Sequence, residues 1–175
     1  MADLPFASSN GSPVVLVPTE IAAEWPGIAD DDFHARYLER SSKVRRTEYG
    51  GFSTMPLAGS KVLIFEGEMH TTWLKEPAGG TFIREGCSHT RARASKLVAS
   101  VPAKAWKGFT KLTLGDGRFV VVDSALATND LATIDTSNGL VRAKLEPGTY
   151  QVDVAALGGI DFARLRRVAK AKRSR

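Results

Sequence analysis

A run of four unbroken apolar residues, Val62 to Phe65, is the feature that most constrains the fold of this chain. The run follows a turn at Gly59-Ser60 and stops at Glu66-Gly67, so it has the length of a strand and not of a helix. A strand with no polar residue among its apolar ones is typically covered on both faces. We therefore expect this run to form a central strand of a sheet.

The chain also contains an approximate internal repeat. A shift of 57 residues, without a gap, aligns Val62–Phe65 with Phe119–Val122 and Glu66 with Asp123. An apolar stretch and a glycine-containing turn precede each run, and such an arrangement predicts a β-hairpin. The two predicted hairpins are 52–57 with 61–66, and 109–114 with 118–123, the second around Gly115-Asp116-Gly117. The sequence thus predicts two related halves, about 13–87 and 106–157, each continuing as a meander.

One segment has a clear helical period. Between Ser88 and Val101, apolar residues recur at spacings of three and four, with basic residues between them, which is typical of an amphipathic helix. Ser88 is the expected N-cap, and Pro102 ends the pattern. The members of the apolar stripe are Ala94, Leu97, Val98 and Val101.

The helical signals near the chain ends are weaker. Thr19 can cap a short helix whose Ile21 and Trp25 share a face, and Asp30–Asp32 can begin a second one. Ile160–Val168 fits a last strand or a helix equally well, because its apolar residues are spaced by three.

These elements predict an α+β fold made mostly of antiparallel sheet. The two related halves are joined by the Ser88–Val101 helix, whose apolar stripe packs on the sheet. Two sheets forming a sandwich is the alternative arrangement. We expect a flexible N-terminus at 1–12, one domain at 13–163 and a basic tail at 164–175.

The charge is distributed unevenly along the 175 residues. The chain carries 24 Lys and Arg and 19 Asp and Glu residues, a net charge of +5. Seven of the basic residues lie between Arg164 and Arg175, which leaves 1–163 with a net charge of −2. Because a basic tail without interleaved aromatic residues is typical of a solvated terminus, nucleic acid is not the expected partner. A nucleic-acid or anionic-surface arm is the alternative.

Several cellular contexts are disfavoured by the sequence. It has no apolar stretch of membrane-spanning length, no signal-like N-terminus and only one cysteine, Cys87. The expected location is therefore the cytoplasm, with no membrane span.

Catalytic and metal-binding patterns are weak. Cys87-Ser88-His89 brings a thiol and an imidazole close in sequence, but a nucleophile also needs an orienting group. Glu66, Glu68 and His70 alternate at a strand end and could offer ligands from one edge, although a solvated strand end is the more common arrangement. Phosphate-binding loops and nucleophile elbows are missing from the sequence. We expect no enzyme, no catalytic residue, no metal, no cofactor and no small-molecule substrate.

The tryptophans offer a different kind of site. Trp25, Trp73 and Trp106 lie at predicted element ends beside polar residues. In that setting a tryptophan can anchor a protein interface, or it can cover the edge of the core.

Five segments occur in the order of the motifs of one known family. They are the opening Gly11–Pro18, Trp25-Pro26-Gly27, Val62–Glu68 with Thr71-Thr72-Trp73, Gly79-Gly80-Thr81-Phe82-Ile83-Arg84, and Pro147-Gly148-Thr149-Tyr150-Gln151-Val152. Over about residues 9–155 the chain resembles the immunity protein 21 family of bacterial polymorphic toxin systems.

The resemblance implies a cytoplasmic protein that binds a cognate secreted toxin and neutralises it stoichiometrically, without chemistry of its own. The candidate partner-binding residues are Trp25, Asp30, Asp31, Asp32, Glu66, Glu68, His70, Thr72 and Trp73. Two alternatives remain open: a small basic binder of nucleic acid or anionic surfaces acting through 164–175, and a metal-dependent hydrolase using Glu66, Glu68, His70 and His89.

Overall fold

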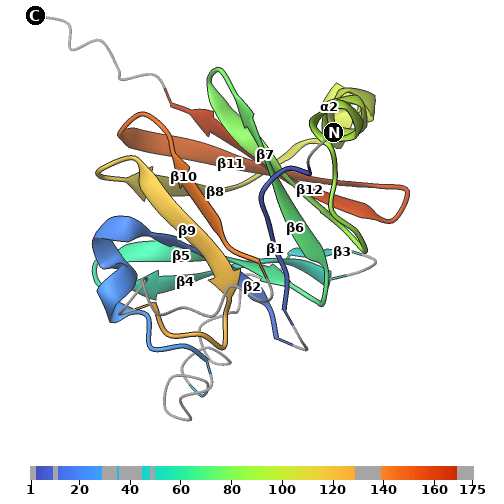
Figure 1. Ribbon diagram of the computed structural model, residues 1–175. Coiled ribbons are helices and arrows are strands. Elements are labelled where there is room, and N and C mark those ends of the chain that lie inside the picture. Colours follow the sequence, from blue (N-terminus) through green and yellow to red (C-terminus); the bar gives the residue numbers. More distant parts are fainter. Residues whose placement is uncertain are drawn as a thin grey trace, which may run out of the picture.

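In the computed structural model the chain forms two antiparallel sheets of six strands each, packed face to face (Figure 1). The structure describes residues 3–9, 12–28, 35, 45–47, 50–128 and 139–168. The predicted class, mostly antiparallel sheet with few helices, is confirmed. Of the two arrangements considered, the structure has the two-sheet sandwich.

The first sheet, called sheet 1 here, contains strands from the N-terminus, the middle and the C-terminus of the chain. In spatial order its strands are β1 (Phe6–Ala7), β6 (His70–Glu76), β7 (Gly79–Glu85), β12 (Ile160–Arg167), β11 (Gly148–Leu157) and β8 (Lys107–Leu114).

The second sheet, called sheet 2, contains both apolar runs identified in the sequence. In spatial order its strands are β10 (Val141–Lys144), β9 (Arg118–Asp123), β2 (Val14–Pro18), β5 (Ser60–Glu66), β4 (Gly50–Leu57) and β3 (Arg45–Thr47).

Strand β2 lies between β5 and β9, so both apolar runs are interior strands, as predicted. Val14 pairs with Phe65 on one side and with Asp123 on the other, an offset of 58 residues, and the next two pairs along β2 keep this offset. The sequence alignment used an offset of 57. Because side chains alternate along a strand, this difference of one residue moves every aligned side chain to the opposite face.

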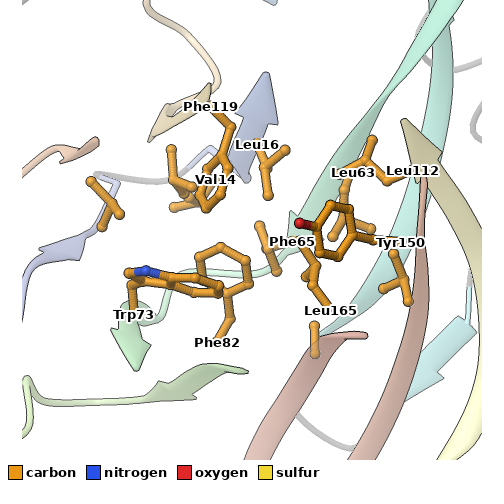
Figure 2. Close-up of a cluster of buried hydrophobic side chains, with 14 of the residues drawn as sticks. Val14, Leu16, Leu63, Phe65, Trp73, Phe82, Leu112, Phe119, Tyr150 and Leu165 are labelled. Carbon is orange, nitrogen blue, oxygen red and sulfur yellow. The ribbon is translucent and has the colours of Figure 1, made fainter. Parts of the chain in front are cut away.

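The core between the sheets is rich in aromatic rings that meet across the sandwich (Figure 2). Trp73 and Phe82 of sheet 1 pack on each other with ring centroids 4.5 Å apart. Their partners from sheet 2 are Phe119, 5.3 Å from Trp73, and Phe65, 5.1 Å from Phe82, both in edge-to-face contact. Such contacts add to the free energy gained by burying the rings.

The predicted second hairpin is wrong. Strands β8 and β9 form where expected, but β8 pairs with β11 in sheet 1 and β9 pairs with β2 and β10 in sheet 2. The turn at Gly115-Asp116-Gly117 therefore carries the chain from one sheet to the other. By contrast, β4 and β5 are paired as predicted, so the two halves do not repeat the same arrangement.

Short helical elements cover the outer faces of the sandwich. Helix α2 (Arg91–Ser100) places Ala94, together with Val101, against the outer face of sheet 1, as predicted. Its N-cap is Thr90 and not Ser88, because the Ser88 hydroxyl donates to Asp3 at 2.7 Å while Thr90 accepts from the backbone of the first turn. A second short element, η2 (Ala103–Ala105), follows α2.

The outer face of sheet 2 is covered by η1 (Thr19–Glu24), a 3₁₀ helix where a short N-terminal helix was predicted. Pro18, not Thr19, stands at its N-cap position. Ile21 and Trp25 are both buried against this face. The second predicted helix, beginning at Asp30–Asp32, lies outside the described residues.

Described parts of both terminal segments form strands. Within the predicted flexible N-terminus, Phe6 pairs with Thr72 in β1, and the amide of Leu4 donates to His89. The undecided segment 160–168 is a strand through Arg167, so Arg164, Arg166 and Arg167 belong to β12 and not to a free tail.

Candidate partner-binding surface

The predicted partner-binding residues separate into exposed and buried groups. Glu66 ends β5, His70 begins β6, and Glu68 lies exposed in the turn between them. Glu66 is half-buried and its carboxylate accepts a hydrogen bond from Ser53. These three residues therefore lie together at one end of the sandwich.

The predicted aromatic anchors are core residues. Trp73 is only 4% exposed and lies in the core between the sheets, while Trp25 is fully buried under η1. Thr72 is also fully buried. Position beside polar residues in sequence does not decide the face of a strand, and the register of Trp73 with Phe82 turns the indole inward. Asp30, Asp31 and Asp32 lie outside the described residues.

The structure adds acidic residues that the sequence analysis missed. Glu85, at the end of β7, pairs in register with His70, and the exposed Asp3 forms a bridge with Thr90 just beyond. We call the group Asp3, Glu66, Glu68, His70 and Glu85 the acidic end. No local pattern predicts this group, because three separate parts of the chain contribute to it.

Arg84 lies under the acidic end, fully buried between the two sheets. It extends from β7 of sheet 1 to backbone carbonyls of sheet 2 and the turn after β5, and its Nη1 lies 3.6 Å from Asp161. The hydrogen bonds run from Nη1 to the oxygen of Gly51 at 3.2 Å, and from Nη2 to those of Glu66 at 2.6 Å and Gly67 at 3.1 Å.

Burial and neighbouring charges shift the pKa of Arg84 in opposite directions. Burial lowers the pKa of its guanidinium to about 10, and the charges of Asp161 and Glu66 partly oppose that shift. Arg84 is therefore still protonated at neutral pH. It holds the carbonyls of the turn that carries Glu68, so the exposed carboxylate stands on a fixed backbone.

A second cluster lies beside the acidic end, on the loop between β7 and α2. Glu85, Cys87 and His89 each offer one ligand atom, and these atoms lie within 4.8 Å of one another. Burial lowers the pKa of His89; the charges of Arg93 and His70 act in the same direction, and those of Glu85 and Asp3 oppose it. In the described part of the chain, the four residues of the hydrolase alternative do not form such a group, and only His89 belongs to this one.

The opposite end of the sandwich has a different character. A pocket of about 550 Å³ lies between the β6–β7 turn and the β10–β11 loop. Tyr150 lines it and donates its hydroxyl to the carbonyl of Glu146 at 2.6 Å, and burial raises the pKa of this phenol. The charged residues of the lining are Lys75, Glu76, Lys144, Glu146 and Arg167. Because both signs of charge are mixed here, the pocket does not select one charge class of ligand.

The basic residues of β12 are held within the fold. Arg166 lies 2.5 Å and Arg164 3.6 Å from the buried carboxylate of Asp153. The hydrogen bond to Asp153 and its charge raise the pKa of Arg166, while Arg164 also lies 4.0 Å from the centre of the Trp106 ring. The third, Arg167, donates to the carbonyl of Pro147 at 2.8 Å. These contacts give no support to a free nucleic-acid-binding arm at 164–167.

Comparison with known proteins identifies a family. The model of the family described as Immunity protein 21 matches residues 6–160 of the chain. Neither a curated protein nor a solved structure matches it. Among the residues that the structure describes, no helix has the length and apolar character needed to cross a membrane.

Proposed function

Because the chain belongs to the immunity protein 21 family, we propose that it neutralises a cognate toxin of a bacterial polymorphic toxin system by binding it one to one in the cytoplasm. In this proposal the protein blocks or distorts the active site of the toxin and performs no reaction itself. The partner is therefore a protein, with neither a small-molecule substrate nor a membrane involved.

The observation that carries this proposal is the acidic end. Glu68 is exposed there on a turn whose carbonyls are held by Arg84, and His70, two residues further on, pairs in register with Glu85. A preformed surface loses little conformational entropy when it binds, so more of the interaction energy appears as affinity. Arg93 pairs with Glu85, but the exposed carboxylates of Glu68 and Asp3 can still speed the encounter with a partner of opposite charge. We therefore expect the toxin to present a basic surface to this end.

The buried tryptophans narrow the binding surface. With Trp25, Thr72 and Trp73 in the core, the described residues left from the predicted set are Glu66, Glu68 and His70. Phe6, half-buried and 5.2 Å from the His70 ring between centroids, is the aromatic residue next to them. Contacts to the toxin would then combine carboxylates with one partly apolar patch.

The test is co-expression with the toxin encoded next to this gene. Glu68→Lys should weaken growth rescue and lower the rate of association measured by surface plasmon resonance, and the loss should shrink at high salt. Glu146→Lys is the matched control, since it makes the same change at an exposed glutamate of the opposite end.

Two results would contradict the proposal. Failure of the wild-type protein to rescue growth or to bind the toxin would remove the function. Rescue lost with Glu146→Lys and kept with Glu68→Lys would move the binding surface to the other end.

A further inference from the structure

The geometry points to a metal site that the sequence analysis did not predict: Glu85, Cys87 and His89 form a three-residue site for Zn²⁺ or a closely related divalent ion. The site lies on the loop that joins β7 to α2. It would exist whether or not a toxin is bound, so it does not depend on the proposed function.

The ligand types fit the ion. Cysteine sulfur, histidine nitrogen and carboxylate oxygen are the three protein ligands of zinc, and sites with three of them leave the fourth position open for water. Mg²⁺ and Ca²⁺ prefer oxygen ligands alone. The combination therefore selects zinc, or cobalt as its usual spectroscopic substitute, over the hard cations.

The spacing of the atoms fits a tetrahedral site. The Oε2 atom of Glu85 lies 3.2 Å from Nε2 of His89 and 3.8 Å from Sγ of Cys87. Zinc bonds of about 2.0–2.1 Å to nitrogen and oxygen and about 2.3 Å to sulfur place tetrahedral ligands about 3.3 Å apart for N and O and about 3.5 Å for S and O. Both observed distances lie within about 0.3 Å of these values. The third, between Sγ of Cys87 and the His89 nitrogen, is at most 4.8 Å, so side-chain rotation at Cys87 would complete the site.

The buried side chain of His89 provides a second, independent indication that this site binds a ligand. Its side chain is 0% exposed, yet neither ring nitrogen has a hydrogen-bond partner among the described residues. Nε2 lies 3.2 Å from Oε2 of Glu85, but the geometry is not that of a hydrogen bond. Buried polar atoms are normally satisfied, and a metal between these two groups would satisfy one of them.

The surroundings include one competitor. Arg93, whose side chain is 52% exposed, donates to both oxygens of Glu85, at 2.9 and 3.2 Å. Its guanidinium must move aside when a cation binds, and its exposure leaves it room to do so. Loss of this charge should therefore raise the metal affinity.

The site is placed to join separate parts of the chain. The backbone of His89 accepts a hydrogen bond from Leu4, and Ser88 donates to Asp3. A metal held by His89 and Glu85 would fix this loop together with the N-terminal segment that packs on it.

The test is titration of the reduced full-length protein with Co²⁺ under nitrogen. A thiolate-to-cobalt charge-transfer band in the near ultraviolet would come from Cys87, because the chain has one cysteine. We expect one equivalent of Co²⁺ to saturate the band, Zn²⁺ to displace it, and thiol labelling of Cys87 to slow when metal is bound.

The variants separate this site from non-specific binding. Cys87→Ser changes an exposed residue and should abolish the band; His89→Gln should weaken binding at least tenfold, and Arg93→Gln should strengthen it. Glu68→Gln, a nearby carboxylate outside the group, should leave it unchanged. The proposal is overturned if the reduced wild-type protein shows no thiolate band at millimolar Co²⁺. It is also overturned if the band saturates at half an equivalent of Co²⁺, because two chains would then share one ion.

Discussion

Replacement of Arg84 by methionine tests how the two sheets are held together at the acidic end. The guanidinium donates to three backbone carbonyls across the sandwich and faces the carboxylate of Asp161, whose side chain is 1% exposed. It also lies 5.7 Å and 5.6 Å from the ring centres of Phe52 and Phe65. Methionine keeps contact with these rings but removes the charge and every donor.

The expected loss of stability follows from what remains after the substitution. Removing one partner of a buried ion pair leaves the other charge uncompensated, which costs about 3–5 kcal/mol. The three carbonyls lose donors worth about 1 kcal/mol each, and methionine packing on the rings offsets part of that loss. We expect Arg84→Met to lower the free energy of unfolding by at least about 4 kcal/mol, a large part of the roughly 5–15 kcal/mol of a typical domain.

The measurement is urea unfolding followed by circular dichroism, with thermal melts in parallel. For a chain of this length, a loss of that size lowers the melting temperature by roughly 10 °C. Arg84→Lys keeps the charge without the fork of donors, so it should fall between wild type and Arg84→Met. The double variant Arg84→Met/Asp161→Asn should lose less stability than the sum of the losses in the two single variants, because no charged carboxylate is then left unpaired. A loss below about 1 kcal/mol for Arg84→Met, or strict additivity in the cycle, would refute this account.

Four further substitutions test local features. Tyr150→Phe removes the hydrogen bond to Glu146 and should lower the free energy of unfolding by about 1 kcal/mol. Because burial raises the pKa of Tyr150, the stability of the wild type should also fall above pH 10. Urea titrations should show that the variant loses this contribution of Tyr150 to the pH dependence. Gly27→Ala should lower the stability measured in thermal melts by at least about 2 kcal/mol, because φ is +84° and the new Cβ would lie 2.4 Å from the Ala125 oxygen. Gly59→Ala is the control: its φ is +75° but the Cβ has open space, so the loss should be only about 1 kcal/mol. Thr90→Ala removes the N-cap of α2 and should cost about 1 kcal/mol.

The buried strands were predictable because their signal is local. Unbroken apolar runs bounded by glycine turns identified β5 and β9, and the spacing of apolar residues identified α2. The pairing of β8 and β9 could not be predicted in the same way, because contacts from elsewhere hold their turn. The amide of Gly115 donates to Glu20 of η1 at 2.6 Å, and the amide of Leu145 donates to Gly117 at 2.8 Å. When distant groups form the hydrogen bonds of a turn, the two strands that flank the turn do not need to pair with each other.

The candidate surface was predictable only in part for the same reason. Alternation at a strand end brought Glu66, Glu68 and His70 together, and the structure keeps them together. The same alternation occurs at Glu85, Cys87 and His89, where it could have predicted a ligand group. It gives no information on which face of β6 enters the core, so it left open whether Trp73 anchors an interface or covers the core, and the structure places Trp73 in the core.

Three residues of the motifs that resemble the family are held by contacts inside the scaffold. Gly27 has φ +84° and no room for a side chain, Tyr150 ties the β10–β11 loop, and Arg84 of the Gly-Gly motif joins the sheets by gripping the turn after β5. Each is fixed by internal contacts that a partner would not touch. Exposed residues such as Glu68 lie on this scaffold, and their side chains do not contribute to these internal contacts. If the protein binds a toxin as proposed, we therefore expect the contact at exposed side chains such as Glu68 and not at these internally held residues.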